Sequence, residues 1–391
     1  MLTEDDELSV QGTASEALIS KSSAVRVGYY KDDFLPLFCR RKDRKPPLIN
    51  RGYYARVQSI NLVVQKFLRL TEDLGETRQV LVLGGGYDTT CLKLLQDKTT
   101  NLQCFEVDFP ALIDRKAFLF MSADLIRETL ELNDHENPNS SSSNDGGMPP
   151  PTTGAGLHRN TTATAAVSSR QREYGYDMGP ALTLISADMK RVDTLLSHLD
   201  ASRFDFTKPT LLVSECVIVY MDKASVVDLC SGLADRFKQT SNPRALWVSY
   251  DMFNPMDQFG KVMLRNLSNG GISVPGLTDY PTLEAQQGRF TETGWAVAES
   301  ISMAAAFRDV ISPRDHQRIS RLEIFDELEE WEMIMSHYCL SLASIGCNDP
   351  STTNLGTIKL NPSIRPDDDV TNSAADGKAS SLGAPAFRFH K

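Results

Sequence analysis

The segment VLVLGGGYDTTCLKLL, residues 80–95, joins a short apolar run to three glycines and then to a stretch with helical spacing. The apolar run at residues 80–83 predicts a buried strand, and the stretch from about Thr89 predicts a helix. Because glycine has no Cβ, Gly84, Gly85 and Gly86 let the backbone turn sharply and approach a ligand closely. A strand, a glycine turn and a helix in this order indicate a site for a nucleotide or another adenosine-containing cofactor.

The glycine turn departs from both common phosphate-binding motifs. The dinucleotide fingerprint G-x-G-x-x-G requires glycine at its sixth position, where this chain has Thr89. A P-loop requires G-K-[ST] after the glycines, and that triplet is missing. The turn alone therefore leaves a dinucleotide open but disfavours it.

Alternating strand and helix patterns follow the glycine turn along the chain, and they predict an α/β fold with a mostly parallel sheet covered on both faces. Asp222 is expected to cap one of the helices. Strands are expected at 80–83, 104–107, 181–186, 210–219 and 246–250, with a final pair within 295–302 and 337–343; helices are expected at 50–71, from about 89, and at 114–131, 190–199, 223–238, 256–267 and 318–335.

Three acidic residues lie at or near the carboxyl ends of these strands, where ligands bind in such sheets. Asp108 ends the second strand and could accept both hydroxyls of an adenosine ribose, although an aspartate there is often only a turn or cap residue. Asp188 follows the third strand. Glu215 lies within the apolar run LLVSECVIVY, where a carboxylate is costly unless it is paired. Acids at these positions favour S-adenosylmethionine, because this cofactor carries an ammonium group that carboxylates would bind. A fourth acid, Asp88, follows the glycines and is interpreted as a helix cap.

Composition restricts the class of protein. The 391 residues carry a net charge of −10, which disfavours nucleic-acid binding, and the basic run RRKDRK at 40–45 is expected to be solvated surface. No long apolar run predicts a membrane span, and the acidic start does not resemble a signal peptide. The seven cysteines form no disulfide framework, and His and Cys do not cluster. We therefore expect reduced cysteines, no metal site, and a cytoplasmic or nuclear location.

Three polar segments are predicted to be disordered, because they cannot bury enough apolar surface to offset the entropy of ordering. They are residues 1–18, residues 134–172 and residues 349–391. The middle segment interrupts a folded region and is interpreted as a surface insertion. The folded domain is expected over residues 19–345.

Several stretches of the chain resemble the leucine carboxyl methyltransferase family in family order. They include KSSAVRVGYYKD (21–32), PPLINRGYYARV (46–57), VLGGGYDTT (82–90), FEVDFP (105–110), SADM (186–189), PTLLVSECVIVYM (209–221), DQFGKVMLRNL (257–267) and IFDELEEWEMIMSHYCLSLA (324–343). The resemblance implies the Rossmann-like S-adenosylmethionine-dependent methyltransferase fold, with a seven-stranded, mostly parallel sheet, helices on both faces, and insertions that cap the site. The chain differs in having Gly85 where the family has alanine and Met189 where leucine is more common.

Residue roles follow from the resemblance. It implies that Gly84 lies near the amino-acid part of S-adenosylmethionine and that Asp108 holds the ribose. Glu215 would serve the amino-acid or ribose end. Lys21 and Arg56 would engage the cofactor carboxylate and border the substrate site. The adenine would contact Asp188 and Met189.

The resemblance further implies a substrate, the C-terminal leucine carboxylate of the type 2A protein phosphatase catalytic subunit. A terminal carboxylate with a pKa of about 3.5 is ionised at neutral pH, so its methylation needs no general base. This agrees with the motif stretches near the strand ends, which contain no histidine, and His337 is interpreted as structural. Arg56 could orient the carboxylate with two hydrogen bonds. Tyr220 could face the substrate, although a core position is equally compatible with the pattern.

Four alternatives remain at this point: a methyltransferase for small-molecule carboxylates, the related methyltransferase of a modified tRNA guanosine, an NAD-dependent oxidoreductase, and an inactive scaffold. The acidic balance and the polar tail disfavour the tRNA enzyme, which carries an additional β-propeller domain. Thr89 and the lack of a second substrate domain disfavour the oxidoreductase. A filled set of cofactor positions disfavours the scaffold. We expect a monomer.

Overall fold

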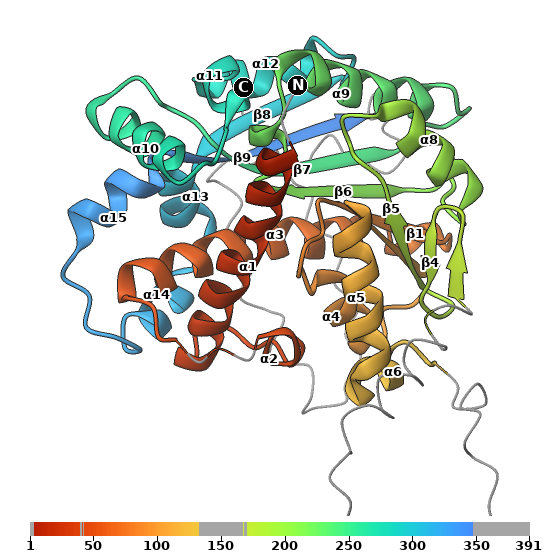
Figure 1. Ribbon diagram of the computed structural model, residues 1–391, viewed down its shortest axis with the longest axis horizontal. Helices are drawn as coiled ribbons and strands as arrows, with labels where there is room; N and C mark the ends of the chain where they lie inside the picture. Colours follow the sequence, from red (N-terminus) through yellow and green to blue (C-terminus); the bar gives the residue numbers. More distant parts are fainter. Residues whose placement is uncertain (1–3, 40, 42, 133–166, 168–169, 347–391) are drawn as a thin grey trace, which may run out of the picture.

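The computed structural model describes residues 4–39, 41, 43–132, 167 and 170–346. Within these residues, nine strands form one sheet in the order β3-β4-β5-β2-β1-β6-β7-β9-β8 (Figure 1). The strands are β1 Arg78–Leu83, β2 Leu102–Asp108, β3 Gln171–Arg172, β4 Gly175–Asp177, β5 Leu182–Ser186, β6 Thr210–Glu215, β7 Ala245–Met252, β8 Val297–Ser302 and β9 Tyr338–Ile345.

The five central strands, β5, β2, β1, β6 and β7, run parallel, and β9 lies antiparallel between β7 and β8. After β1 the chain first builds β2 and β5 on one side, and it then returns to place β6 and β7 on the other. The order therefore reverses between β1 and β6, and this is the position where open α/β sheets bind ligands.

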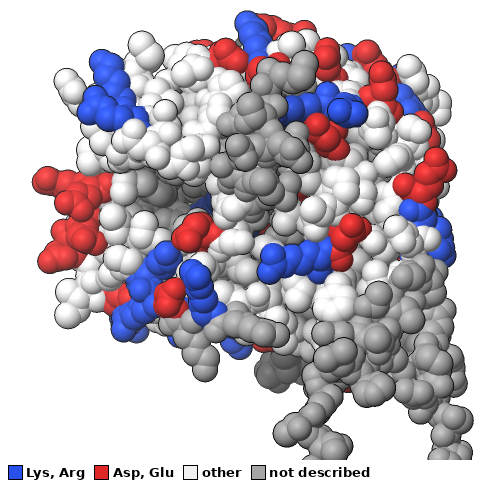
Figure 2. Space-filling model, viewed as in Figure 1, with Lys and Arg blue, Asp and Glu red and all other residues white. Residues whose placement is uncertain are grey.

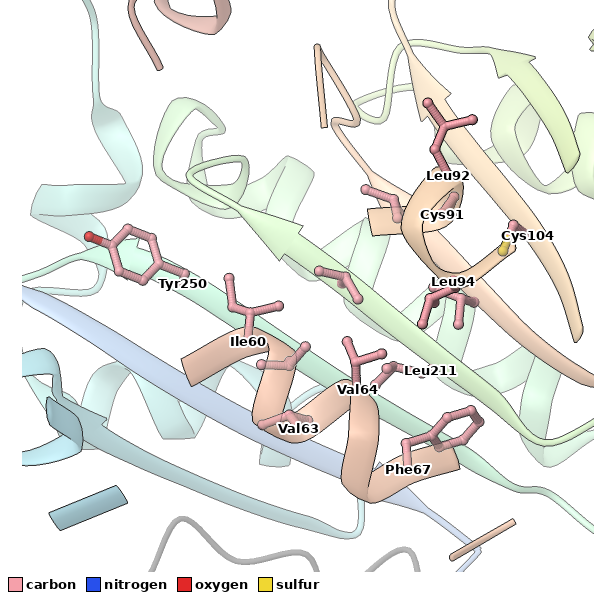
Figure 3. Packing of buried hydrophobic residues seen from close by; sticks show 14 of the residues in the cluster. Ile60, Val63, Val64, Phe67, Cys91, Leu92, Leu94, Cys104, Leu211 and Tyr250 are labelled. Atoms are coloured by element: carbon pink, nitrogen blue, oxygen red, sulfur yellow. The ribbon is translucent and has the colours of Figure 1, made fainter. Parts of the chain in front are cut away.

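Apolar strand residues alternate between two cores, one on each face of the sheet. Val80 and Val82 belong to the core that includes α3 (Pro47–Leu70) and α4 (Thr90–Gln96), whereas Leu81 and Leu83 belong to the opposite core. Figure 3 shows the first core, where the α3 side chains face Leu211 of β6. Both faces of the sheet are thus buried, which explains the near-continuous apolar runs of its central strands.

Helices cover both faces (Figure 1). The first core also contains side chains of α5, α6 and α13, and the second contains side chains of α8, α9 and α12. The remaining helices are α1 Glu4–Val27, α2 Leu35–Phe38, α5 Pro110–Ser122, α6 Asp124–Thr129, α8 Val192–Ala201, α9 Lys223–Lys238, α10 Gln258–Asn269, α11 Pro275–Asp279, α12 Leu283–Thr291, α13 Met303–Val310, α14 Pro313–Ile319 and α15 Leu328–Met335, with 3₁₀ turns at Glu72–Leu74 and Ile218–Tyr220.

The expected α/β fold is confirmed, and the expected final pair of strands is present as β8 and β9, which pair antiparallel. The sheet has nine strands where seven were expected. The two additional strands, β3 and β4, have two and three residues and extend the β5 edge antiparallel. Such short strands contain too few residues for a recognisable alternation of polar and apolar side chains.

The N-terminal segment differs from its prediction. Residues 1–18 were expected to be disordered, but α1 begins at Glu4 and continues to Val27. Leu18 is buried against Leu35 and Tyr87, so a tertiary contact holds a segment that composition alone marks as polar. Most of the predicted insertion at 134–172, and the predicted tail at 349–391, lie outside the described residues.

Three predicted elements are interrupted. The helix expected at 114–131 is divided into α5 and α6, because the backbone of Ala123 is extended. The strand expected at 210–219 ends at Glu215, because Cys216 has φ of 53° and leaves the extended conformation. The helix expected at 318–335 is divided into α14 and α15. The connecting segment is fixed to α3 instead, since Arg51 packs over the ring of Phe325 and Asn50 donates a hydrogen bond to buried Glu323.

The described residues of the basic run lie at the surface, as expected, and two of them pair with acids. Arg44 forms an ion pair with Glu323, and Lys45 forms one with Glu16. Figure 2 shows acidic and basic side chains interspersed over one face, with acidic side chains gathered at the left edge, where Figure 1 draws α15. No helix in the described part of the chain is long and apolar enough to cross a membrane.

Candidate active site

A cavity of about 340 Å³ lies at the carboxyl ends of β1, β2 and β6, next to the point where the strand order reverses. Its volume falls within the range of small-molecule and cofactor sites. All eight predicted site residues line it, although they come from distant parts of the sequence: Lys21, Arg56, Gly84, Asp108, Asp188, Met189, Glu215 and Tyr220. The structure thus brings the predicted residues together, while the role of each remains a prediction.

The glycine turn forms one wall of the cavity. Gly84 has φ of 68°, and a Cβ at this position would collide with the side chain of Val217. Only glycine combines this conformation with so close a neighbour. The amides of Gly84 and Gly85 both donate to the carbonyl of Val107, which fastens the turn to β2.

Asp108 is fixed by the same turn. Its carboxylate accepts hydrogen bonds from the amide of Gly86 at 2.6 Å and from the amide of Phe109 at 2.8 Å. Burial raises the pKa of Asp108, although these two N–H groups favour the ionised form. The side chain is therefore held in one orientation at the cavity wall, as a ligand for a diol would have to be.

Two basic and two acidic side chains meet at the other side of the turn. Arg56 Nε donates to Glu215 at 2.6 Å, and Lys21 Nζ donates to the same carboxylate oxygen at 3.1 Å. Lys21 also donates to Asp88 at 3.3 Å. Although burial favours a neutral acid, the charges of Lys21 and Arg56 hold the pKa of Glu215 below its usual value. The four groups are therefore ionised and mutually compensated.

Asp88 was expected to act only as a helix cap. Its side chain does accept a hydrogen bond from the amide of Thr90, at the start of α4. However, its second oxygen pairs with Lys21, and the residue lines the cavity. The sequence position of Asp88 could not distinguish a helix cap from an ion-pair partner, because a carboxylate has two oxygens and can perform both roles.

Aromatic side chains surround Arg56. Its guanidinium lies 4.7 Å from the ring centroid of Tyr250 and 5.7 Å from that of Tyr53. Tyr250 stacks on Tyr338 with centroids 5.4 Å apart. Tyr220, expected at a strand end, lies instead in the 3₁₀ turn after β6, and it lines the same part of the cavity. Burial raises the pKa of Tyr220, so this phenol stays protonated at neutral pH.

Helix α1 contributes cavity residues that the sequence did not predict. Thr13, Ala14, Ala17 and Leu18 line the cavity, and a Cβ at Gly86 would lie 3.3 Å from the Cβ of Ala14. The spacing of these residues in the sequence does indicate a helix, because Ala14, Ala17 and Leu18 have the i, i+3, i+4 spacing of one helix face. That signal is weak because alanine contributes little apolar surface.

The far end of the cavity contains the predicted adenine contacts. Met189 is buried, and Asp188 accepts a hydrogen bond from the amide of Lys190 at 3.0 Å, as a turn residue would.

His337 lies outside the cavity lining and bonds to Asp257 and to the carbonyl of Met333, in agreement with a structural role. Among the described residues, no group of three His, Cys, Asp or Glu side chains could hold a metal ion.

In the sheet, β9 lies antiparallel between β7 and β8, and the cavity joins a glycine turn to an acid at the end of β2. Together with the family match that follows, this arrangement assigns the chain to the α/β methyltransferases. The family model described as leucine carboxyl methyltransferase matches residues 3–234. The chain therefore belongs to the leucine carboxyl methyltransferase family.

Curated relatives agree over most of the chain. The protein is 32% identical to leucine carboxyl methyltransferase 1 of Rattus norvegicus, over 88% of this chain and 91% of the relative. It is 29% identical to the leucine carboxyl methyltransferase 1 homolog of Arabidopsis thaliana, over 85% and 88%. It is also 32% identical to tRNA wybutosine-synthesizing protein 4 of Rattus norvegicus, but it covers only 44% of that relative.

Proposed function

We propose that the protein transfers a methyl group from S-adenosylmethionine to the α-carboxylate of the C-terminal leucine of the protein phosphatase 2A catalytic subunit. The observation that carries the proposal is the arrangement of Lys21 and Arg56 around one carboxylate, Glu215, in the cavity that also contains Asp108. Lys21 and Arg56, which can bind carboxylates, therefore lie in the same cavity as Asp108, whose fixed carboxylate can bind a ribose. The relatives named leucine carboxyl methyltransferase 1 support the same substrate class.

The residues of the cavity fit S-adenosylmethionine. Asp108 suits the ribose diol, and Met189 gives an apolar surface for the adenine. Asp88 and Glu215 suit an ammonium group, whereas Lys21 suits a carboxylate. When bound there, the cofactor supplies an electrophilic sulfonium methyl group. A pyrophosphate would meet acids rather than free N–H groups, because the amides of Gly84, Gly85 and Gly86 already donate to β2.

Arg56 would orient the acceptor carboxylate. Its Nε is occupied by Glu215, while the guanidinium extends toward Cys216 and the backbone carbonyl of Glu215 with longer contacts of 3.7 and 3.5 Å. These longer contacts can be exchanged for hydrogen bonds to an incoming carboxylate at small cost. The tyrosines around Arg56 exclude water, and a less hydrated carboxylate is a better nucleophile. No residue has to remove a proton, since the acceptor is already ionised.

An apolar area beside Arg56 suits the leucine side chain. Met252, Ile334, Met335 and Tyr338 line this part of the cavity. Methionine side chains adapt to branched aliphatic groups because they are flexible and polarizable. Together with Arg56, the area would recognise a free carboxylate attached to an aliphatic residue, which is the chemistry of a C-terminal leucine.

The remaining expectations belong to the same proposal. We propose that the enzyme acts as a monomer in the cytoplasm or nucleus. Nucleic acid is not proposed as a partner, because the net charge is −10 and Arg44 and Lys45 of the basic run are paired with acids.

Label transfer from methyl-tritiated S-adenosylmethionine tests the proposal. Intact phosphatase catalytic subunit should become labelled, and the label should be released by mild base because it is an ester. The same subunit without its terminal leucine is the matched control and should stay unlabelled. Labelling of both forms would contradict the leucine substrate. Methylation of tRNA without labelling of the phosphatase would favour instead the function that the name tRNA wybutosine-synthesizing protein 4 indicates for that relative.

A further inference from the structure

A buried ion pair lies directly below the glycine turn and outside the cavity. Glu106 on β2 and Lys116 on α5 form this pair, with side chains exposed by 0% and 1%. Neither residue lines the cavity. Two charges removed from water are costly, and apolar residues of similar size often stabilise a fold at least as well. Fold stability by itself therefore does not explain why a charged pair occupies this position.

The pair contacts the turn from below. A Cβ at Gly85 would lie 3.4 Å from Glu106 Oε2 and 3.7 Å from Lys116 Nζ, so the turn rests on both charged groups. Lys116 Nζ also donates a hydrogen bond to the backbone carbonyl of Asp88 at 3.0 Å. The end of the turn is thereby fastened to α5.

The turn is thus anchored to β2 at residues 84–86 and to α5 at Asp88. Glu106 and Asp108 are two residues apart on one strand, and therefore share a face of the sheet. Asp108 accepts the amide hydrogen of Gly86, and Lys116 holds the carbonyl of Asp88. Asp88 in turn pairs with Lys21 in the cavity. A displacement of the pair would therefore move Asp88 and Lys21 together.

Water cannot easily replace a lost partner at this position. Cys104 precedes Glu106 on the same face of β2 and is buried, and Figure 3 shows it beside Cys91 of α4. The ring of Phe120 lies 5.8 Å from Lys116 Nζ. An apolar shell of this kind keeps the ion pair strong and its geometry fixed.

We propose that Glu106 and Lys116 are positioning residues that hold residues 84–88 in the shape required for binding of the cofactor. This inference rests on the proposed function, because it assigns the ion pair to the S-adenosylmethionine site. It predicts that the pair controls affinity for the cofactor and has little influence on the acceptor substrate.

Three variants test the inference: Glu106→Gln, Lys116→Met, and the double variant Glu106→Gln/Lys116→Met. Each single variant leaves one buried charge unpaired and should lose both stability and cofactor affinity. The double variant leaves no unpaired charge, so it should regain stability. It still lacks the Lys116 hydrogen bond to Asp88, and its dissociation constant for S-adenosylmethionine should remain about 10- to 100-fold above that of the wild type.

Calorimetric titration of S-adenosylmethionine and S-adenosylhomocysteine into the full chain measures the affinity. Amide hydrogen exchange without ligand should be faster at residues 84–90 in the double variant. In the methylation assay, KM for the cofactor should rise while KM for the protein substrate stays within about threefold. The matched control is the double variant Asp251→Asn/Arg289→Met, which removes another buried ion pair. Both side chains of this pair are 1% exposed, and neither residue lines the cavity. It should keep wild-type affinity for the cofactor.

The outcomes separate a positioning role from a structural one. A double variant that regains both stability and affinity would overturn the inference. An equal loss of affinity in the Asp251–Arg289 control would also overturn it, since any buried pair would then have the same effect. If the wild type does not bind S-adenosylmethionine, the proposed function fails and the inference fails with it. If the wild type binds and the three variants bind equally well, only the inference fails.

Discussion

At the scale of single residues, the proposed function assigns the acceptor carboxylate to Arg56, which lines the cavity. Arg56→Ala should reduce kcat/KM for methyl transfer by about 10- to 100-fold, since hydrogen bonds to charged groups contribute about 1.5–3 kcal/mol. The steady-state methylation assay measures this effect. Arg69→Ala is the matched control, because Arg69 lies on the same helix but is exposed at its last turn. Unchanged turnover in folded Arg56→Ala protein would remove Arg56 from the site.

Glu215 gives a prediction about pH. Lys21 and Arg56 lower the pKa of Glu215 below its unfolded value of about 4.3. A lowered acid pKa contributes stability that is fully present above about pH 4.3 and is lost as the pH falls toward the folded pKa. The free energy of unfolding should therefore decrease below about pH 4.

Glu215→Gln isolates this contribution, because the other acids titrate in both proteins. Urea unfolding at several pH values should show a stability difference between wild type and variant that is large at pH 7 and shrinks below about pH 4. A difference that stays constant down to pH 3 would mean that Glu215 is not the titrating partner of Lys21 and Arg56.

Some residues of the cavity could be predicted from local sequence patterns, and others could not. Glu215 was singled out because a carboxylate in an apolar run needs a partner, and the partners are Lys21 and Arg56. Gly84 was singled out from its turn, and its positive φ explains why glycine is required. Tyr250 and Tyr338 could not be identified as site residues, because buried tyrosines in strands are common and carry no local signal.

At the scale of elements, α1 contacts the glycine-turn segment through a small apolar cluster around Leu18. Leu18 packs with Leu35 and Tyr87, and Tyr87 belongs to the glycine turn segment. Leu18→Ala should loosen α1, because the lost apolar contacts form a small cluster that cannot repack. Hydrogen exchange over residues 12–20 should become faster, and cofactor affinity should decrease.

The control for this prediction is Val227→Ala on α9, a shortened side chain that is 38% exposed. It should change neither exchange in α1 nor cofactor affinity. If Leu18→Ala exchanges as slowly as the wild type over residues 12–20, then α1 is held by contacts other than this cluster.

Element boundaries illustrate the limit of local patterns. The helix over 50–71 was predicted from its apolar period and is observed at Pro47–Leu70. Asp222 caps α9 as predicted, with its carboxylate accepting the amide hydrogen of Ser225. The division of the helix over 318–335 escaped prediction, because the interruption depends on Asn50 and Arg51, which are distant in sequence.

At the scale of the whole molecule, cofactor binding should stabilise the fold. A ligand that binds only the folded state adds RT ln(1 + [L]/Kd), or about 2.7 kcal/mol at a hundredfold excess over Kd. The thermal unfolding midpoint should therefore rise with S-adenosylmethionine and with S-adenosylhomocysteine. NAD at the same concentration is the control and should have no effect. A shift with NAD alone would support the oxidoreductase alternative.

The sequence by itself determined the α/β class, the order of most strands and helices, and part of the cavity lining, such as Gly84, Asp108 and Glu215. These features depend on local periodicity, on glycine conformation, and on the cost of burying a charge, which act within a few residues. Only the tertiary structure decided that α1 is a helix at the cavity, that Asp88 pairs with Lys21, and that Glu106 and Lys116 lie below the glycine turn. These features depend on which distant side chains meet when the sheet assembles, and no local pattern contains that information.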